Sequence, residues 1–119
     1  MKQPCGYTVK GSEDKVCRLQ KSLYGLKQAA RSWNQKLHDE LKRSGFQRCK
    51  SDPCLYRKCQ NKRWCYVLVY VDDLVVASED LKMIDTLVGV LRKSFEVCAL
   101  GDIHFYLGME VEKTVEIIF

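Results

Sequence analysis

The sequence has 119 residues, of which 46% are hydrophobic, enough for one domain with a modest core. No apolar run reaches the roughly 18 residues of a membrane-spanning helix. The N-terminus also lacks the basic and then apolar pattern of a secretory signal. These features argue against a membrane-spanning or secreted protein, and we expect a soluble intracellular one, cytoplasmic or nuclear.

The formal net charge of +5 is unevenly distributed. Residues 1–63 hold 16 lysines and arginines against 5 aspartates and glutamates, whereas residues 64–119 hold 4 against 10. A basic first half suits phosphate backbones, and an acidic second half suits metal ions. An ordinary solvated surface would give the same pattern, so charge alone leaves both interpretations open.

The seven cysteines are odd in number and lack the close pairs of a zinc or redox motif. Cys49, Cys54 and Cys59 recur every five residues, which raises a structural zinc site as one alternative. Zinc ligands usually begin two to four residues apart, however. We therefore favour free thiols in a reducing compartment.

The first elements are expected to be a loop and a helix. Residues 1–21 are polar and interrupted by proline and glycine, which indicates a loop-rich segment. From Ala29 to Ser44 apolar residues fall at intervals of four, which predicts an amphipathic helix. Gly45 supplies a helix stop, and Phe46 is placed to pack back as in a Schellman ending.

A β-hairpin should follow. The stretch 51–58 opens with a turn signal and continues into a short strand, and the polar tip 60–63 leads into an almost wholly apolar run. That run, from Trp64 to Val71, is too uniformly apolar for a strand with one wet face, so we expect it to be central and buried on both faces. A tight turn at Asp72–Asp73 and a further strand complete the pattern.

A second helix is expected from about Glu79 to Lys93, capped by Ser78 or Asp80 and with acidic residues in its first turn. Its apolar face is expected to contain Leu81, Ile84, Leu87, Val88 and Leu91. A strand from about Ile103 to Glu112 and the start of another at Val115 should follow. The fold class is therefore α+β, an antiparallel sheet with helices packed on one face.

Asp72 and Asp73 interrupt the apolar run and admit two interpretations. They could simply be turn formers, because aspartate tolerates turn geometry. A two-residue hairpin turn usually has Asn-Gly or Asp-Gly, however, and adjacent like charges repel unless a cation lies near them. Carboxylate oxygens are the ligands that Mg²⁺ prefers, so a divalent-metal site is the functional interpretation.

Three ordered motifs carry a family resemblance. "YVDD" (70–73) resembles the catalytic hairpin of reverse transcriptases. "SLYGLKQAARSW" (22–33) and "LGDIHFYLGMEV" (100–111) resemble specifically the copia-type LTR retrotransposon polymerase. The resemblance implies one partial reverse-transcriptase domain over 1–119, with a palm core at 22–112 and the start of a further strand at 113–119. It also implies an RNA-directed DNA polymerase that uses two Mg²⁺ ions in nucleotidyl transfer, with RNA or DNA primer-template and dNTPs as partners, inside a virus-like particle or the nucleus.

The resemblance also implies roles for individual residues. Asp72 and Asp73 would be catalytic metal ligands, beside a primer terminus and an incoming nucleotide. The other roles fall into two groups: nucleotide and template contacts by Tyr70, Val71, Gln28, Gly25, Lys27 and Arg31, and a primer grip formed by Leu107, Gly108 and Met109.

The chain departs from the family pattern in one important way. The third catalytic carboxylate of the family lies in an upstream stretch resembling "DVKTAFLNG", which these residues do not include. We therefore expect a polymerase fragment that is inactive by itself, with an exposed sheet edge through which it could associate. The alternative is a nucleic-acid-binding or assembly module that uses the basic first half without chemistry.

Overall fold

The computed structural model describes residues 1–112, and the strand start expected at Val115 lies outside these residues. The elements follow the α+β order expected from the sequence. In chain order they are α1 (Lys27–Arg43), β1 (Gln47–Arg48), β2 (Leu55–Gln60), β3 (Arg63–Tyr70), β4 (Asp73–Ser78), α2 (Leu81–Ser94), β5 (Phe105–Tyr106) and β6 (Met109–Glu110).

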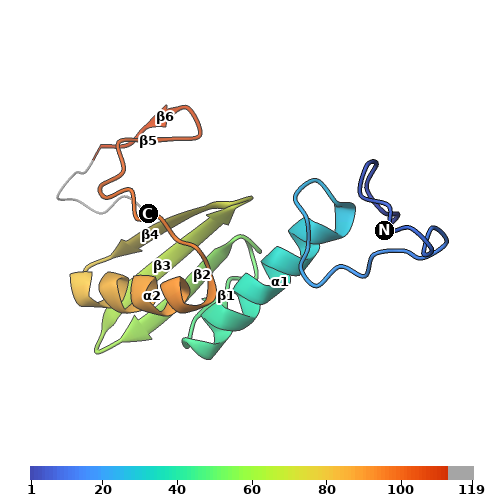
Figure 1. Ribbon diagram of the computed structural model, residues 1–119. Coiled ribbons are helices and arrows are strands. Elements are labelled where there is room, and N and C mark those ends of the chain that lie inside the picture. The colour runs from blue at the N-terminus through green and yellow to red at the C-terminus, as the bar shows by residue number, and fades with distance from the viewer. Residues whose placement is uncertain (113–119) are drawn as a thin grey trace.

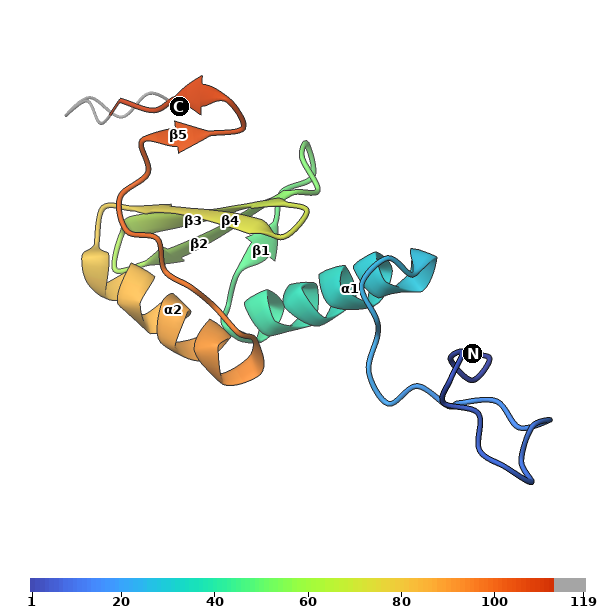
Figure 2. The same ribbon diagram turned by 45° about the horizontal axis from the view of Figure 1, so that its top comes forward.

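Strands β1 to β4 form one antiparallel sheet in their sequence order, and β5 and β6 form a separate two-stranded hairpin. Both helices lie on one face of the four-stranded sheet, as expected (Figure 1). Figure 2 shows the β5–β6 hairpin on the opposite side of the sheet. The sheet therefore has a helix-covered face and an outer face, and the chain after α2 crosses from one to the other.

The core lies between the helix-covered face and the two helices. Side chains alternate between the faces of a strand, so every second residue of β3 points at the helices. The buried core consists of Leu37, Leu41, Phe46, Tyr56, Cys65, Val67, Val69, Leu87 and Leu91. The prediction that β3 is buried on both faces is wrong, because the residues between its buried positions are partly or fully exposed.

Helix α1 ends as expected. Gly45 has φ +87°, a conformation that favours glycine. The Phe46 N–H donates to the Leu41 carbonyl at 3.0 Å, and the Gly45 N–H donates to the Lys42 carbonyl at 3.0 Å. This is the Schellman pattern, and it turns Phe46 back into the core.

Helix α2 begins two residues later than expected. Asp80 is its N-cap, since its carboxylate accepts a hydrogen bond from the Lys82 N–H at 3.0 Å. No acidic residue lies in the first turn, contrary to expectation, because Glu79 and Asp80 both precede the helix. Leu81 was expected on the apolar face but is exposed, since it lies on the first turn beyond the reach of the core.

Of two further hairpin turns in the structure, one agrees with the predicted strands and the other does not. Asn61 and Lys62 both have positive φ and join β2 to β3, which confirms the polar tip. The single strand expected from Ile103 to Glu112 is instead a hairpin, because Leu107 and Gly108 have φ of +51° and +77° and reverse the chain.

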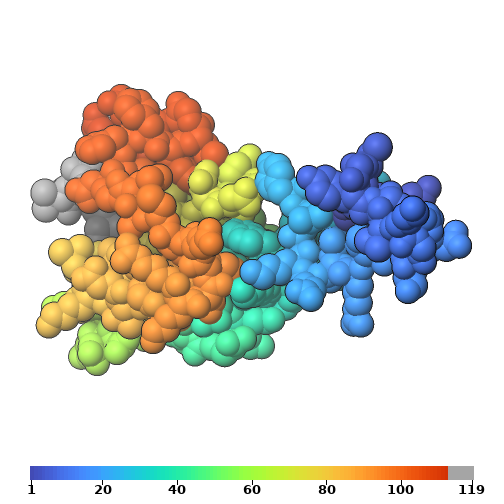
Figure 3. Space-filling view, viewed as in Figure 1, coloured from blue at the N-terminus to red at the C-terminus, as the bar shows by residue number. Residues whose placement is uncertain are grey.

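Residues 1–26 contain no helix or strand and lie beyond the N-terminal end of α1, away from the sheet (Figure 3). Gln3 ties this segment together: its Nε2 donates to the Ser12 and Lys15 carbonyls at 2.7 and 2.8 Å, and its Oε1 accepts from the Val9 N–H at 2.8 Å. Within residues 1–112, no helix is long and apolar enough to cross a membrane.

The core should depend strongly on Leu41, which is 0% exposed. We expect Leu41→Ala to lower the free energy of unfolding by roughly 2–5 kcal/mol, because it removes buried methyl groups and leaves a cavity. Urea denaturation followed by circular dichroism measures this. Leu81→Ala, at an exposed leucine, is the matched control and should cost under about 1 kcal/mol. Equal losses in the two variants would contradict the assigned core.

Candidate active site

The two candidate carboxylates lie where β3 meets β4, but the turn differs from the predicted one. Tyr70 pairs with Asp73, so the two-residue turn consists of Val71 and Asp72. Asp73 is the first residue of β4 rather than part of the turn. The register explains the difference: Val69 must face the core opposite Leu74, which places Tyr70 and Asp73 together on the outer face.

Both carboxylates are exposed. Among the described residues, neither side chain takes part in a hydrogen bond or an ion pair. Structural turn aspartates commonly accept hydrogen bonds from nearby backbone N–H groups, as Asp52 does from the Cys54 N–H at 2.8 Å. Asp72 and Asp73 lack this local role, which leaves their oxygens available to a ligand.

The turn itself is strained. Val71 has φ +52°, a left-handed conformation that a β-branched residue rarely adopts. Asp72 has no positive φ, so the pattern is that of a type II′ turn, which normally has glycine at the first position. Such a conformation costs on the order of 1–3 kcal/mol and persists only where the surrounding structure enforces it. The buried strands on either side supply that constraint.

Tyr106 is a neighbour of this site that the sequence did not single out. Its Oη is buried and has no hydrogen-bond partner within residues 1–112. Burial raises the pKa of the Tyr106 hydroxyl, and the negative charge of Asp73 raises it further, followed by Tyr70 and Cys54. These contributions place the β5–β6 hairpin close to the outer-face pair Tyr70 and Asp73. No spacing or motif in the sequence links Tyr106 to Asp73.

The candidate template contacts lie around the start of α1. Lys27 and Gln28 form the first turn of the helix and Arg31 lies one turn further, all of them exposed. Gly25 has φ +87° and reverses the chain just before the helix. Figures 1 and 2 show this end of α1 extending past the same end of the sheet as the Val71–Asp72 turn. The sequence predicted α1 from Ala29, and it begins two residues earlier.

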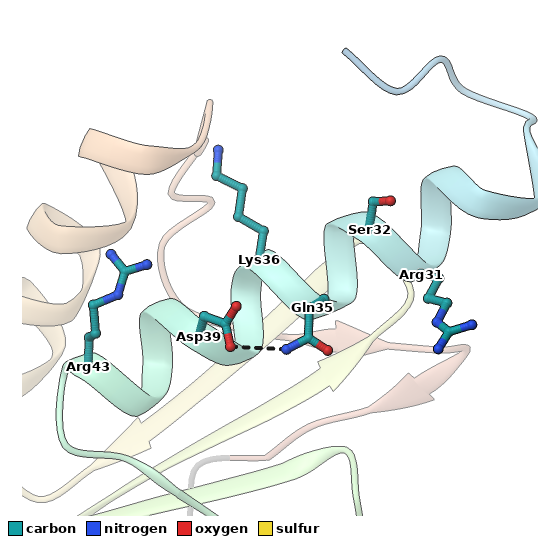
Figure 4. Close-up of a pocket in the computed structure, with 6 residues that line it drawn as sticks. All are labelled: Arg31, Ser32, Gln35, Lys36, Asp39 and Arg43. Atoms are coloured by element: carbon teal, nitrogen blue, oxygen red, sulfur yellow. Dashed lines mark hydrogen bonds between the residues drawn. The ribbon is translucent and has the colours of Figure 1, made fainter. Parts of the chain in front are cut away.

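Arg31 also borders an open depression along α1, shown in Figure 4. The depression is lined by Arg31, Ser32, Gln35, Lys36, Asp39 and Arg43. Gln35 Nε2 donates a hydrogen bond to Asp39 Oδ1 at 3.0 Å, so this carboxylate oxygen already has a partner within the helix. None of the other candidate site residues lines it, so we do not assign it to the carboxylate site.

The candidate primer-grip residues form the tip of the β5–β6 hairpin. Leu107 and Gly108 are the two turn residues, and Met109 begins β6 opposite Tyr106. Both apolar side chains are exposed, at 49% for Leu107 and 58% for Met109. An exposed apolar tip offers contact surface to a ligand or to another part of a larger protein.

The cysteines do not form a metal site within residues 1–112, where no group of three or more cysteine, histidine or acidic side chains could hold a metal ion. Cys65 lies in the core, and burial raises the pKa of its thiol. His38, one of the two histidines, is structural: its Nδ1 lies 3.1 Å from the hydroxyl of Tyr56. Asp72 and Asp73 are therefore a two-carboxylate arrangement in the described part of the chain.

These features define a small α+β domain that presents a pair of unpartnered carboxylates on a strained hairpin. Residues 1–119 match the family described as "Reverse transcriptase (RNA-dependent DNA polymerase)", and the chain belongs to that family. The chain is 40% identical over 112 residues to a retrovirus-related Pol polyprotein from transposon TNT 1-94 of Nicotiana tabacum. It is 37% identical over 113 residues to the Pol polyprotein from transposon RE2 of Arabidopsis thaliana.

The matches cover most of this chain and little of its relatives. They span 93% and 95% of this chain but only 8% of each plant polyprotein. The chain also matches a putative transposon Ty5-1 protein of Saccharomyces cerevisiae, at 34% identity over 96% of this chain and 37% of that protein. No solved structure matches the chain.

Tyr106→Phe tests the position of the hydroxyl. In an alkaline titration followed by absorbance near 295 nm, we expect the variant to lack one tyrosine ionisation whose pKa lies above the ordinary value of 10.0. The folded-state pKa of Tyr106 is raised, so its contribution to stability is complete below the unfolded pKa and is lost as the pH rises through the folded pKa. The wild type should therefore lose more stability than the variant above about pH 10. Tyr24→Phe, at a fully exposed tyrosine, is the control, and an identical change in both variants would contradict the assignment.

Proposed function

We propose that the chain is part of the palm of an RNA-directed DNA polymerase encoded by a copia-type retrotransposon Pol polyprotein. The observation that carries this proposal is the pair of carboxylates, Asp72 and Asp73, which lie at the end of the central strand β3 and have no hydrogen-bond or ion-pair partner within the described residues. Family membership and the antiparallel sheet with helices on one face support it.

Asp72 and Asp73 would hold Mg²⁺. They fit the ion in part, because within residues 1–112 their hard carboxylate oxygens have no hydrogen-bond or ion-pair partner and are exposed at the turn. Mg²⁺ held by Asp72 and Asp73 would supply Lewis-acid chemistry for nucleotidyl transfer, in which a primer 3′-hydroxyl is activated and charge on the leaving pyrophosphate is stabilised. Asp73 lies on the outer face with Tyr70, so both residues face the side on which the β5–β6 hairpin lies.

The remaining residues would position the nucleic acid. Tyr70 and Val71 lie beside the carboxylates and would contact the primer terminus and the incoming nucleotide. Gly25, Lys27, Gln28 and Arg31, at the start of α1, would contact nucleotide and template, the cations by pairing with phosphate. Leu107, Gly108 and Met109 would hold the primer from the hairpin tip. Figures 1 and 2 show the start of α1 and the turn between β3 and β4 toward the same end of the sheet, which supports a shared ligand for these two groups.

We further propose that these residues do not complete a polymerase by themselves. Within residues 1–112 no third acidic side chain joins Asp72 and Asp73. Strand β4 is at the edge of the sheet and pairs only with β3 in the described region, so its other edge can receive a strand. An acidic strand of the same polyprotein, paired there, would bring the third carboxylate next to Asp73.

A primer-extension assay tests catalysis. With Mg²⁺ and a primed RNA template, we expect no extension by the chain alone. We expect templated extension when the chain is fused to the preceding segment of the tobacco TNT 1-94 polyprotein, and no detectable product from the fused Asp72→Asn variant.

The control is Asp85→Asn, which removes an exposed carboxylate on α2 and should leave extension unchanged. Extension by the unfused chain that disappears in Asp72→Asn would contradict the incomplete site. Extension by the fusion that survives Asp72→Asn would contradict the catalytic assignment.

Metal binding can be measured without catalysis. We expect Mn²⁺, a paramagnetic substitute for Mg²⁺ at oxygen ligands, to broaden the backbone amide resonances of residues 70–74 selectively in heteronuclear NMR spectra. The double variant Asp72→Asn/Asp73→Asn should lose this broadening, because within residues 1–112 no other acidic side chain joins these two aspartates. Broadening that persists at residues 70–74 in the double variant would place the ion on other ligands.

A non-catalytic nucleic-acid-binding module is the second candidate function. The observation that favours it is the unbalanced basic charge of residues 1–63, with 16 cations against 5 acids. Salt-sensitive binding of primer-template by the fused protein, with no extension in any condition and no effect of the Asp72→Asn/Asp73→Asn variant, would select this function over polymerisation.

A further inference from the structure

A stacked pair of aromatic rings lies on the outer face of the sheet. Trp64 and Tyr66 are two residues apart on β3, with ring centroids 6.1 Å apart and planes inclined by only 20°. Cys65 between them is fully buried in the core. Because strand side chains alternate, both rings stand on the face away from the helices. Trp64 is 40% exposed, so part of its ring is open to solvent.

An arginine side chain lies next to this aromatic pair. Arg57 of β2 is directly opposite Tyr66 in the sheet register, so its side chain leaves from the same face. Its guanidinium carbon lies 5.8 Å from the centroid of the Trp64 ring, within the range of a cation–π interaction. Arg57 is exposed and takes part in no ion pair within the described part of the chain, so its charge is not neutralised by a carboxylate.

The surrounding hairpin is also basic. Residues 55–70 include four cations, Arg57, Lys58, Lys62 and Arg63, and no aspartate or glutamate. Arg63 is paired with Asp80 at 3.2 Å, and Lys58 lies over the Phe46 ring on the other face. Two cations of this hairpin are therefore available to bind an anionic ligand. They are Arg57, beside the rings, and Lys62, at the exposed hairpin tip.

We infer that Arg57, Trp64 and Tyr66 form a stacking platform for single-stranded nucleic acid. Exposed aromatic rings stack on bases of any sequence, and arginine adds both a stacking plane and a contact to phosphate. The two ring centroids lie 6.1 Å apart along one strand, a spacing that an extended single strand can follow. The basic, acid-free hairpin favours a polyanion over a neutral protein surface.

This platform is separate from the carboxylate turn. Trp64 precedes Tyr70 by six residues along β3, which corresponds to roughly 20 Å. The platform requires no metal ion, and its existence does not depend on the proposed polymerase activity. It would hold a single strand at the end of the sheet opposite Asp72 and Asp73.

A structural role is the competing explanation, because cross-strand pairs of arginine and aromatic residues stabilise sheets by themselves. That explanation predicts a loss of stability when Trp64 is replaced, with no effect on nucleic-acid binding. Binding and stability must therefore be measured on the same variants.

Trp64 fluorescence provides a direct test. The chain has two tryptophans, so Trp33→Phe leaves Trp64 as the only one. Titration with a 15-residue oligo-uridylate in EDTA should quench its emission with saturation. In this background, Arg57→Gln should raise the dissociation constant roughly 5-fold or more. By fluorescence anisotropy of a labelled oligonucleotide, Trp64→Leu should raise it roughly 10-fold or more.

Matched controls separate the platform from general charge and exposure. Lys82→Gln removes one cation from α2, and Tyr7→Leu removes an exposed aromatic ring from the N-terminal segment; each should change the dissociation constant less than 2-fold. Trp64→Phe keeps a ring and should retain most of the affinity, which covers the case in which Trp64→Leu does not fold. Circular dichroism checks the fold of each variant.

Several outcomes would overturn the inference. Trp64 emission that stays constant at saturating oligonucleotide would do so, and so would equal affinity of Trp64→Leu, Arg57→Gln and the unmodified chain. Equal affinity for a duplex of the same length would mean that binding comes from phosphate contacts alone, without stacking of the rings on bases. Self-association in sedimentation velocity that requires Trp64, combined with unchanged oligonucleotide binding, would assign the rings to a protein interface instead.

Discussion

Burial of one face of the sheet against two helices is the constraint on which the rest of this structure depends. Val67 in the centre of β3 is fully buried, and Leu41 of α1 and Leu91 of α2 belong to the same core cluster. A one-residue shift of β3 would expose every one of its core side chains, so this burial fixes the register. The register in turn places Tyr70 opposite Asp73 and leaves Val71 and Asp72 as the turn.

The carboxylate turn is therefore held by the core and not by contacts of its own. Asp72 and Asp73 have no hydrogen-bond or ion-pair partners in residues 1–112, and Val71 adopts a left-handed conformation unfavourable for valine. A turn chosen only for stability would have glycine at this position and would use its aspartates to cap backbone N–H groups. Unpartnered charge and local strain at the end of a rigid strand are features that serve ligand binding better than folding.

Burial of only one face of the sheet also explains why its outer face carries aromatic and charged side chains. Since only one face of β3 contributes to the core, the alternate residues need not be small or apolar. At one end of the sheet these are Tyr70 and Asp73, which lie close to Tyr106 of the β5–β6 hairpin. At the other end they are Trp64 and Tyr66 with Arg57. The same alternation thus supplies two chemically different surfaces on one strand.

The sequence by itself determined the elements that depend on local chemistry. The periodicity of α1, its ending at Gly45 and the polar tip of the β2–β3 hairpin each follow from near neighbours in the chain, which also limited the cap of α2 to Ser78 or Asp80. The motif around Asp72 and Asp73 also indicated the reverse-transcriptase family, which the comparisons confirm. These features need no knowledge of distant contacts.

Only the tertiary structure decided which faces are buried and which residues meet. Uniform hydrophobicity in β3 predicted burial on both sides, but with both helices on one side of the sheet its alternate residues stay partly or fully exposed. The influence of Asp73 on the pKa of Tyr106 links residues 33 positions apart, and no periodicity encodes it. Likewise, the pairing of Arg57 with Trp64 depends on the register between strands, which the core packing sets.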